Sequence, residues 1–211
     1  MKTVNYMIET TILGSEDGLD TFDIRKTINT EGKSAIIIAL YPTVSILDPY
    51  KTDSSTLYLV NKMHELYYND IHIINLFSKV VSESGISVKK LSKNPENIEY
   101  IKSLMNNVKE NKTDIIIAWG SSMKRNRMVI EIKKIILQVI SENKLQNQLK
   151  QLSFLDDNEE EVKMFCPHML WVGLHGKNAI WTTKNVTIRE IMEDLGIKKK
   201  KDNSQKRNKK M

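Results

Sequence analysis

The sequence predicts an α/β protein in which helices cover both faces of a central, mainly parallel sheet of four strands, a three-layer α/β/α arrangement. Two observations lead to this fold class. Mainly apolar runs that are too short for helices alternate with segments of helical period, as in strands joined by helical crossovers. Polar or small residues follow each run, as they do at the carboxyl ends of parallel strands. The four apolar runs are residues 35–40, 71–77, 114–118 and 169–174.

The amino-terminal part predicts an antiparallel pair at one edge of this sheet. Residues 6–13 and 21–28 are rich in β-forming side chains, and the turn-forming residues 14–18 separate them. The first parallel strand follows at 35–40 and is stopped by Pro42.

The middle of the chain alternates helices with the next two strands. Asp53 supplies the cap of a helix that precedes strand 71–77, and Asn94 begins a helix that continues to about Lys109. Strand 114–118 comes next, and an amphipathic helix at 128–140 follows it.

The carboxyl-terminal third is predicted to contain one strand and one helix. Residues 141–163 are polar and include the acidic run 156–161, so we expect a polar insertion without a packed strand. Residues 169–174 are the expected fourth parallel strand. A last helix, capped by Thr187, is expected to run to Leu195.

The composition fits one globular domain. The chain has 211 residues, 40% hydrophobic and 27% charged, with room for a sizeable core. The single cysteine, Cys166, excludes an intrachain disulfide and a multi-cysteine zinc site, and the four histidines show no ligand spacing. We therefore expect no metal and no cofactor.

Neither a secretory signal nor a membrane span is expected. The first ten residues hold no apolar core of the length of a signal, and no run reaches eighteen apolar residues. We therefore expect a cytoplasmic protein.

Positive charge is concentrated in the last fourteen residues. Residues 198–211 carry eight lysines and arginines against one aspartate, whereas the whole chain has a net charge of +6, so residues 1–197 are near neutral. We expect a single domain at 1–197 and a disordered basic tail at 198–211. The tail serves either solubility or attraction to nucleic-acid phosphates.

Because the carboxyl ends of parallel strands meet at one edge of a sheet, the polar residues there are expected to form a pocket. His175 is a candidate acid, base or hydrogen-bond donor, or a structural residue, and Asn75 either binds a base or sugar or ties two loops together. Asp53 is a candidate catalytic carboxylate, although a capping role is favoured. The candidates that line the pocket are Pro42, Thr43, Gly120, Ser121 and Ser122.

A phosphate site is predicted where the helix after Ser122 begins. Lys124, Arg125 and Arg127 fall in its expected first turn, where cations oppose the helix dipole, and a bound anion would resolve that conflict. The alternative is that these side chains point into water.

Four further residues have weaker cases. Trp119 is expected to pack in the core, and Trp181 is the better candidate for stacking on a base. Cys166 and His168 are close in sequence but are not expected to form a thiol and imidazole pair.

The strand ends resemble a bacterial and phage family known as domain of unknown function 1643. That family has a strand ending in Leu-Asn-Pro-Ser, an Asp-x-Thr helix start, and later Asn-Leu-Phe, Ala-Trp-Gly and Leu-Gly-Leu. The similar elements here are Leu40 to Thr43, Asp53 to Thr56, Asn75 to Phe77, Ala118 to Gly120 and Val172 to Leu174. Tyr41 and Thr43 replace the asparagine and serine of the family pattern.

More distantly, Pro42, Trp119-Gly120 and His175 resemble three landmarks of the uracil-DNA glycosylase-like fold. This resemblance implies a base-binding site at the same edge of the sheet. Tyr41 stands where that fold places the residue that activates water.

Two functions of different classes follow. The first is a protein that binds a nucleotide, nucleobase or nucleic acid, with or without glycosylase-like chemistry on an N-glycosidic bond. The second is a non-catalytic interaction protein of a phage or mobile element that binds a protein or nucleic-acid partner through its basic tail and acidic loop.

Overall fold

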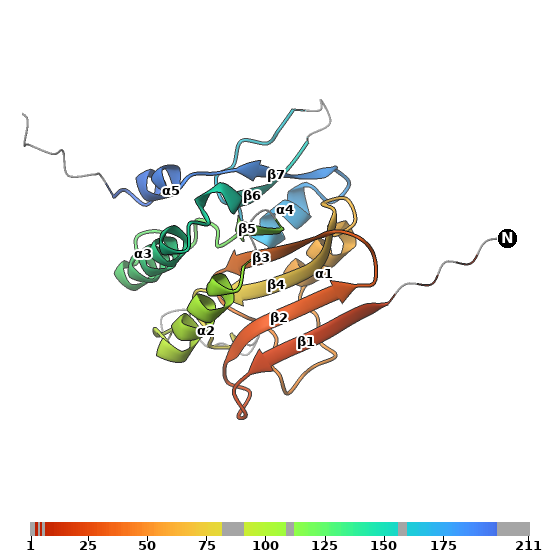
Figure 1. Cartoon of the computed structure of the whole chain (residues 1–211), viewed down its shortest axis with the longest axis horizontal. Helices are drawn as coiled ribbons and strands as arrows, with labels where there is room; N and C mark the ends of the chain where they lie inside the picture. Colours follow the sequence, from red (N-terminus) through yellow and green to blue (C-terminus); the bar gives the residue numbers. More distant parts are fainter. Residues whose placement is uncertain are drawn as a thin grey trace, which may run out of the picture.

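The fold is built on one sheet of seven strands with helices on both faces (Figure 1). The computed structural model describes residues 3, 5, 7–81, 91–108, 112–155 and 160–197. The sheet order is β1-β2-β4-β3-β5-β6-β7. The strands are β1 (Ile8–Gly14), β2 (Thr21–Ile28), β3 (Lys33–Ala39), β4 (Tyr68–Asn75), β5 (Thr113–Ile117), β6 (Leu149–Phe154) and β7 (Trp181–Asn185).

Five α-helices are described. Asp53, Asn94, Asn126, His168 and Thr187 accept backbone N–H groups at their amino ends, and three of these caps, Asp53, Asn94 and Thr187, confirm the prediction. The helices are α1 (Ser54–Lys62), α2 (Pro95–Asn106), α3 (Arg127–Glu142), α4 (Met169–His175) and α5 (Ile188–Asp194), with a 3-10 turn η2 (Gln146–Gln148) before β6.

The α/β class is confirmed, and the sheet is wider than predicted. Strands β4, β3, β5 and β6 run parallel to one another. Strands β1 and β2 form an antiparallel pair that joins β4, and β7 pairs antiparallel with β6 at the other edge. The seventh strand, β7, was not predicted.

The fourth parallel strand is β6, so the prediction of a polar insertion at 141–163 is wrong. Three polar side chains in and next to β6 are buried, Gln148, Gln151 and Ser153, which hides the strand in the sequence. Gln151 is satisfied by the loop that follows, because its Oε1 accepts the Cys166 N–H at 2.9 Å and its Nε2 donates to the Met164 carbonyl at 2.9 Å.

The predicted strand at 169–174 is a helix, α4. Its buried residues are Met169, Val172 and Gly173, a helical rather than an alternating spacing. An apolar run of six residues fits a strand or a buried helical turn equally well, which explains the error.

Both faces of the central strands are buried, as in sheets covered on two sides. Side chains of one parity, such as Ile36 and Ile38 on β3, pack with α2, α3 and α5. Side chains of the other parity, such as Ile37, pack with α1 and α4. Figure 1 shows α2, α3 and α5 on one side of the sheet and α1 and α4 on the other.

Two predicted features lie outside the described residues. They are positions 156–159 of the acidic run and the basic tail 198–211. In the described part of the chain, no helix has the length and apolar character that a bilayer crossing requires.

Candidate functional site

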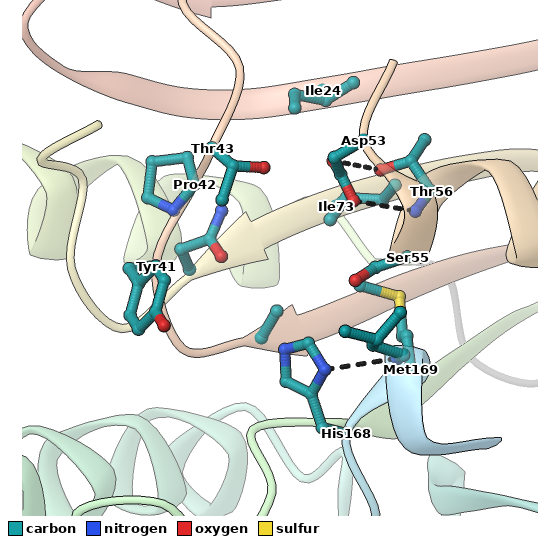
Figure 2. A pocket seen from close by; sticks show the side chains of 13 residues that line it. Ile24, Tyr41, Pro42, Thr43, Asp53, Ser55, Thr56, Ile73, His168 and Met169 are labelled. Carbon is teal, nitrogen blue, oxygen red and sulfur yellow. Dashed lines mark hydrogen bonds between the residues drawn. The ribbon is translucent and has the colours of Figure 1, made fainter. Parts of the chain in front are cut away.

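A pocket of about 150 Å³ lies at the carboxyl ends of β3 and β4 (Figure 2). Figure 2 shows Pro42 and Thr43 on one side, Asp53 and Thr56 on the other, and the His168 imidazole at its edge. The lining residues come from β2, the end of β3, the loop between β3 and α1, the first turn of α1, β4 and the start of α4: Ile24, Ala39, Tyr41, Pro42, Thr43, Asp53, Ser55, Thr56, Ile73, Asn75, His168, Met169 and Leu170.

Asn75 brings an unpartnered amide into this pocket. It is the last residue of β4, and the alternation of the strand turns its side chain to the same face as Ile73. Its backbone is fixed, because its carbonyl accepts the Asn97 amide at 3.0 Å. Asn75 is only 2% exposed, yet none of the described residues hydrogen-bonds to its side chain. The amide is not among the fully enclosed polar atoms that lack a partner, so it is open to the pocket and available to a ligand.

Asp53 lines the pocket while it caps α1. Its Oδ1 accepts the Thr56 N–H at 3.0 Å, and its Oδ2 accepts the Thr56 hydroxyl at 2.8 Å. The favoured capping role is therefore confirmed. Because each carboxylate oxygen has a second lone pair, Asp53 can still accept a hydrogen bond from a ligand.

His168 enters the pocket from the loop after β6. It is the N-cap of α4, and its Nδ1 accepts the backbone N–H of Leu170 at 3.1 Å. A backbone N–H only donates, so Nδ1 carries no hydrogen, and the neutral ring has its proton on Nε2. The cap therefore fixes the tautomer and leaves Nε2–H for the pocket.

Burial keeps His168 neutral. Desolvation lowers the pKa of its imidazole, and the negative charge of Asp53 opposes that shift with a smaller effect. At neutral pH the ring is thus a hydrogen-bond donor of fixed orientation rather than a cation.

The loop after β5 supports the pocket from behind. Gly120 has a φ of +68°, and a Cβ there would lie 3.1 Å from the Cβ of His168. Trp119 is 2% exposed and packs in the core, as predicted. This close backbone approach explains a glycine at position 120.

Four of the predicted site residues meet in the pocket, namely Pro42, Thr43, Asp53 and Asn75. His175 does not, because it lies exposed on the last turn of α4, where its ring stacks on Trp171 at 4.4 Å. The pocket histidine is His168, which sequence reasoning missed. The one feature of the sequence that could have identified His168 is its position after the parallel strand β6. The buried glutamines hid that strand.

The predicted phosphate site is not built at a helix terminus. Helix α3 begins at Arg127, after a turn that contains Lys124 and Arg125, and Asn126 already accepts the first free N–H groups. The Lys124 ammonium contacts Asp194 at 2.6 Å. Gly120, Ser121, Ser122, Lys124 and Arg125 do not line the pocket, so anion binding by this turn remains a prediction.

Two other candidates belong to the core. Trp181 is 2% exposed and donates its Nε1–H to the Gly176 carbonyl at 2.9 Å, so it offers no free stacking face. Burial raises the pKa of the Cys166 thiol to about 12, so it is not an activated nucleophile. Among the residues that the structure places, no cluster of three or more histidine, cysteine or acidic side chains is suited to a metal ion.

Comparison with known proteins gives one match. A family described as Protein of unknown function (DUF1643) matches residues 22–161, which include β2 to β6 and much of the pocket. No curated protein and no solved structure matches the chain significantly.

Proposed function

The chain belongs to the family Protein of unknown function (DUF1643), and we propose that it binds a nucleobase, free or as part of a nucleotide or nucleic acid, in the pocket around Asn75. The observation that carries this proposal is the amide of Asn75, which lines the pocket and has no hydrogen-bond partner among the described residues. A carboxamide presents a donor and an acceptor side by side, which is the complement of a base edge.

The other polar groups of the pocket fit the same ligand. His168 offers one Nε2–H donor, and Asp53 offers carboxylate acceptors. The walls formed by Ile24, Ala39 and Ile73 are apolar and suit a flat ring. Heteroaromatic bases combine these features, with donors and acceptors at the edge and apolar faces.

The size of the pocket limits what enters it. A volume of about 150 Å³ is well below the roughly 300–1,000 Å³ of sites for drug-sized ligands. It admits one base-sized ring. The sugar and phosphate of a nucleotide would then lie outside, towards the loops.

Binding alone and N-glycosidic cleavage remain two versions of this proposal. In cleavage, the base leaves with the electron pair of its bond to the sugar, and water supplies the new hydroxyl. His168, rather than His175, would then donate its Nε2–H to the negative charge that develops on the base.

The test is thermal unfolding of the full chain with free bases, nucleosides, nucleotides and short single-stranded DNA. A true ligand at about one hundred times its dissociation constant adds roughly 2.7 kcal/mol to the free energy of unfolding. We expect Asn75→Ala to weaken binding by about 1–3 kcal/mol. The unliganded variant should unfold close to the parent, because no protein group loses a partner.

Asn61→Ala is the matched control, since this asparagine lies on α1 outside the pocket. It should bind as the parent does. Equal binding of all bases and nucleotides by the parent and by Asn75→Ala would disprove the proposal.

A further inference from the structure

A second cavity of about 380 Å³ lies between the carboxyl-terminal half of α2 and the amino ends of the parallel strands. It is at the opposite end of the sheet from Asn75 and on the other face. We call it the α2 cavity. Its lining is Ser34, Ile36, Asp70, His72, Leu104, Asn107, Val108, Lys112 and Thr113.

His72 on β4 is oriented by a buried carboxylate. Its Nδ1 lies 2.5 Å from Oδ2 of Asp23, and Tyr100 on α2 donates its hydroxyl to the same oxygen at 2.6 Å. Asp23 is 4% exposed, and its Oδ1 has no hydrogen-bond partner among the described residues. Because Asp23 accepts, Nδ1 of His72 carries a hydrogen.

The other ring nitrogen is free for a ligand. In the neutral form of the His72 ring, Nε2 carries a lone pair, and none of the described groups hydrogen-bonds to that atom. The ring itself lines the α2 cavity, and its side chain is 18% exposed. An oriented imidazole with a free acceptor at a cavity is the arrangement that binds a hydroxyl or amine hydrogen.

The charged side chains around the cavity differ in whether they are free to contact a ligand. Asp70 and Arg25 neutralise each other through two hydrogen bonds of 2.8 and 2.9 Å. Lys112 is exposed and forms no ion pair in the described part of the chain, while its carbonyl is fixed by the Ser34 N–H at 3.2 Å. Lys112 is therefore the cation that an anionic ligand would contact.

We propose that the α2 cavity is a second ligand site, which takes a small organic anion that also carries a hydroxyl group. The anionic group contacts Lys112, and the hydroxyl donates to Nε2 of His72. The body of the molecule packs on Ile36, Leu104 and Val108. The volume lies within the roughly 300–1,000 Å³ of small-molecule sites.

The probe is 4-hydroxybenzoate, with two relatives that each lack one feature. Benzoate has no hydroxyl, and 4-hydroxybenzamide has no charge. Binding is followed in the full chain by long-range ¹H–¹⁵N correlations of the His72 ring and by the methyl signals of Ile36 and Leu104. We expect 4-hydroxybenzoate to shift these signals saturably and to bind at least about tenfold more tightly than either relative.

Lys112→Ala should weaken the binding of 4-hydroxybenzoate at least about tenfold, because the cation that contacts the carboxylate is lost. Lys134→Ala removes an exposed lysine of α3 outside the cavity and should change nothing. His72→Gln should reduce the preference for 4-hydroxybenzoate over benzoate. If His72→Gln unfolds, Lys112→Ala still tests the proposal.

Three results would overturn the proposal: no saturable shift up to about 10 mM probe, equal binding of the three probes, or unchanged binding by Lys112→Ala. Asn75→Ala should bind 4-hydroxybenzoate as the parent does. The outcome at the α2 cavity is therefore independent of the outcome at the pocket around Asn75.

Discussion

The ammonium group of Lys133, on α3, lies 4.7 Å from the centre of the Trp119 ring. Lys133 is 1% exposed and forms no ion pair with the carboxylates that the structure describes. The ring face favours a cation, but the loss of water is the larger effect, and burial lowers the pKa of Lys133 to about 8. The core thus holds an amine that changes its charge slightly above neutral pH.

The first prediction concerns this amine. Below pH 8 it is charged in both the folded and the unfolded chain, and the folded state bears the cost of burying the charge. Between about pH 8 and 10.5 the unfolded chain binds more protons, so Lys133 increases the free energy of unfolding, by about 3 kcal/mol in total. Urea unfolding from pH 7 to 10 measures this contribution.

Lys133→Met is the matched variant, because methionine keeps a similar volume without the charge. The buried Cys166, whose pKa is raised to about 12, works in the opposite direction above pH 9, since its thiol ionises only in the unfolded chain. That effect is present in both proteins. The difference between parent and variant should shrink from pH 8 upwards, and a constant difference would contradict the assignment.

The second prediction uses two glycines of similar conformation. Gly120 and Gly196 have φ values of +68° and +73°, but only Gly120 has a neighbour, His168, within reach of an added Cβ. Alanine should cost about 1 kcal/mol at each position. Gly120→Ala should also displace His168 and change its imidazole NMR signals. If Gly196→Ala changes those signals equally, Gly120 does not position the histidine.

Local rules predicted much of the fold correctly. The first three parallel strands are mainly apolar runs, such as Ala35 to Leu40, which are too short for helices and are buried on both faces. The caps Asp53 and Thr187 use side chains that are strongly preferred at helix starts. Because these signals are local, one sequence was enough.

The parts of the fold that were predicted wrongly depend on tertiary contacts. Strand β6 buries Gln151, which is stable only because the backbone of a distant loop satisfies its amide. Once that strand was missed, the fourth strand was placed on α4, and His175 was selected in place of His168. Asn75 and Asp53 were found because their strand and helix ends were correctly located.

The third prediction separates two polar contacts near α3. Asn126 accepts N–H groups of Met128 and Val129 as the helix cap, so Asn126→Ala should lower the free energy of unfolding by about 1 kcal/mol. Lys124 and Asp194 form an ion pair in which both side chains are about 40% exposed. Lys124→Ala should therefore change stability by less than about 1 kcal/mol. Denaturant unfolding at two salt concentrations measures both effects, and a larger loss for Lys124→Ala would reverse this order.

The fourth prediction tests how α4 packs on α1. A Cβ at Gly173 would lie 2.3 Å from Cδ2 and 2.8 Å from Cβ of Tyr58, so alanine forces the two helices apart. Helix propensity alone favours alanine by about 1 kcal/mol. We expect the overpacking to dominate and Gly173→Ala to lose about 1–2 kcal/mol in denaturant unfolding.

A double-mutant cycle with Tyr58→Ala distinguishes the two effects. Without the tyrosine ring the clash is relieved, and Gly173→Ala should become neutral or stabilising, which gives a coupling energy of at least about 1 kcal/mol. Additive effects would mean that Tyr58 does not limit the approach of α4. Since α4 begins beside His168, the contact between Gly173 and Tyr58 also fixes the position from which His168 enters the pocket around Asn75.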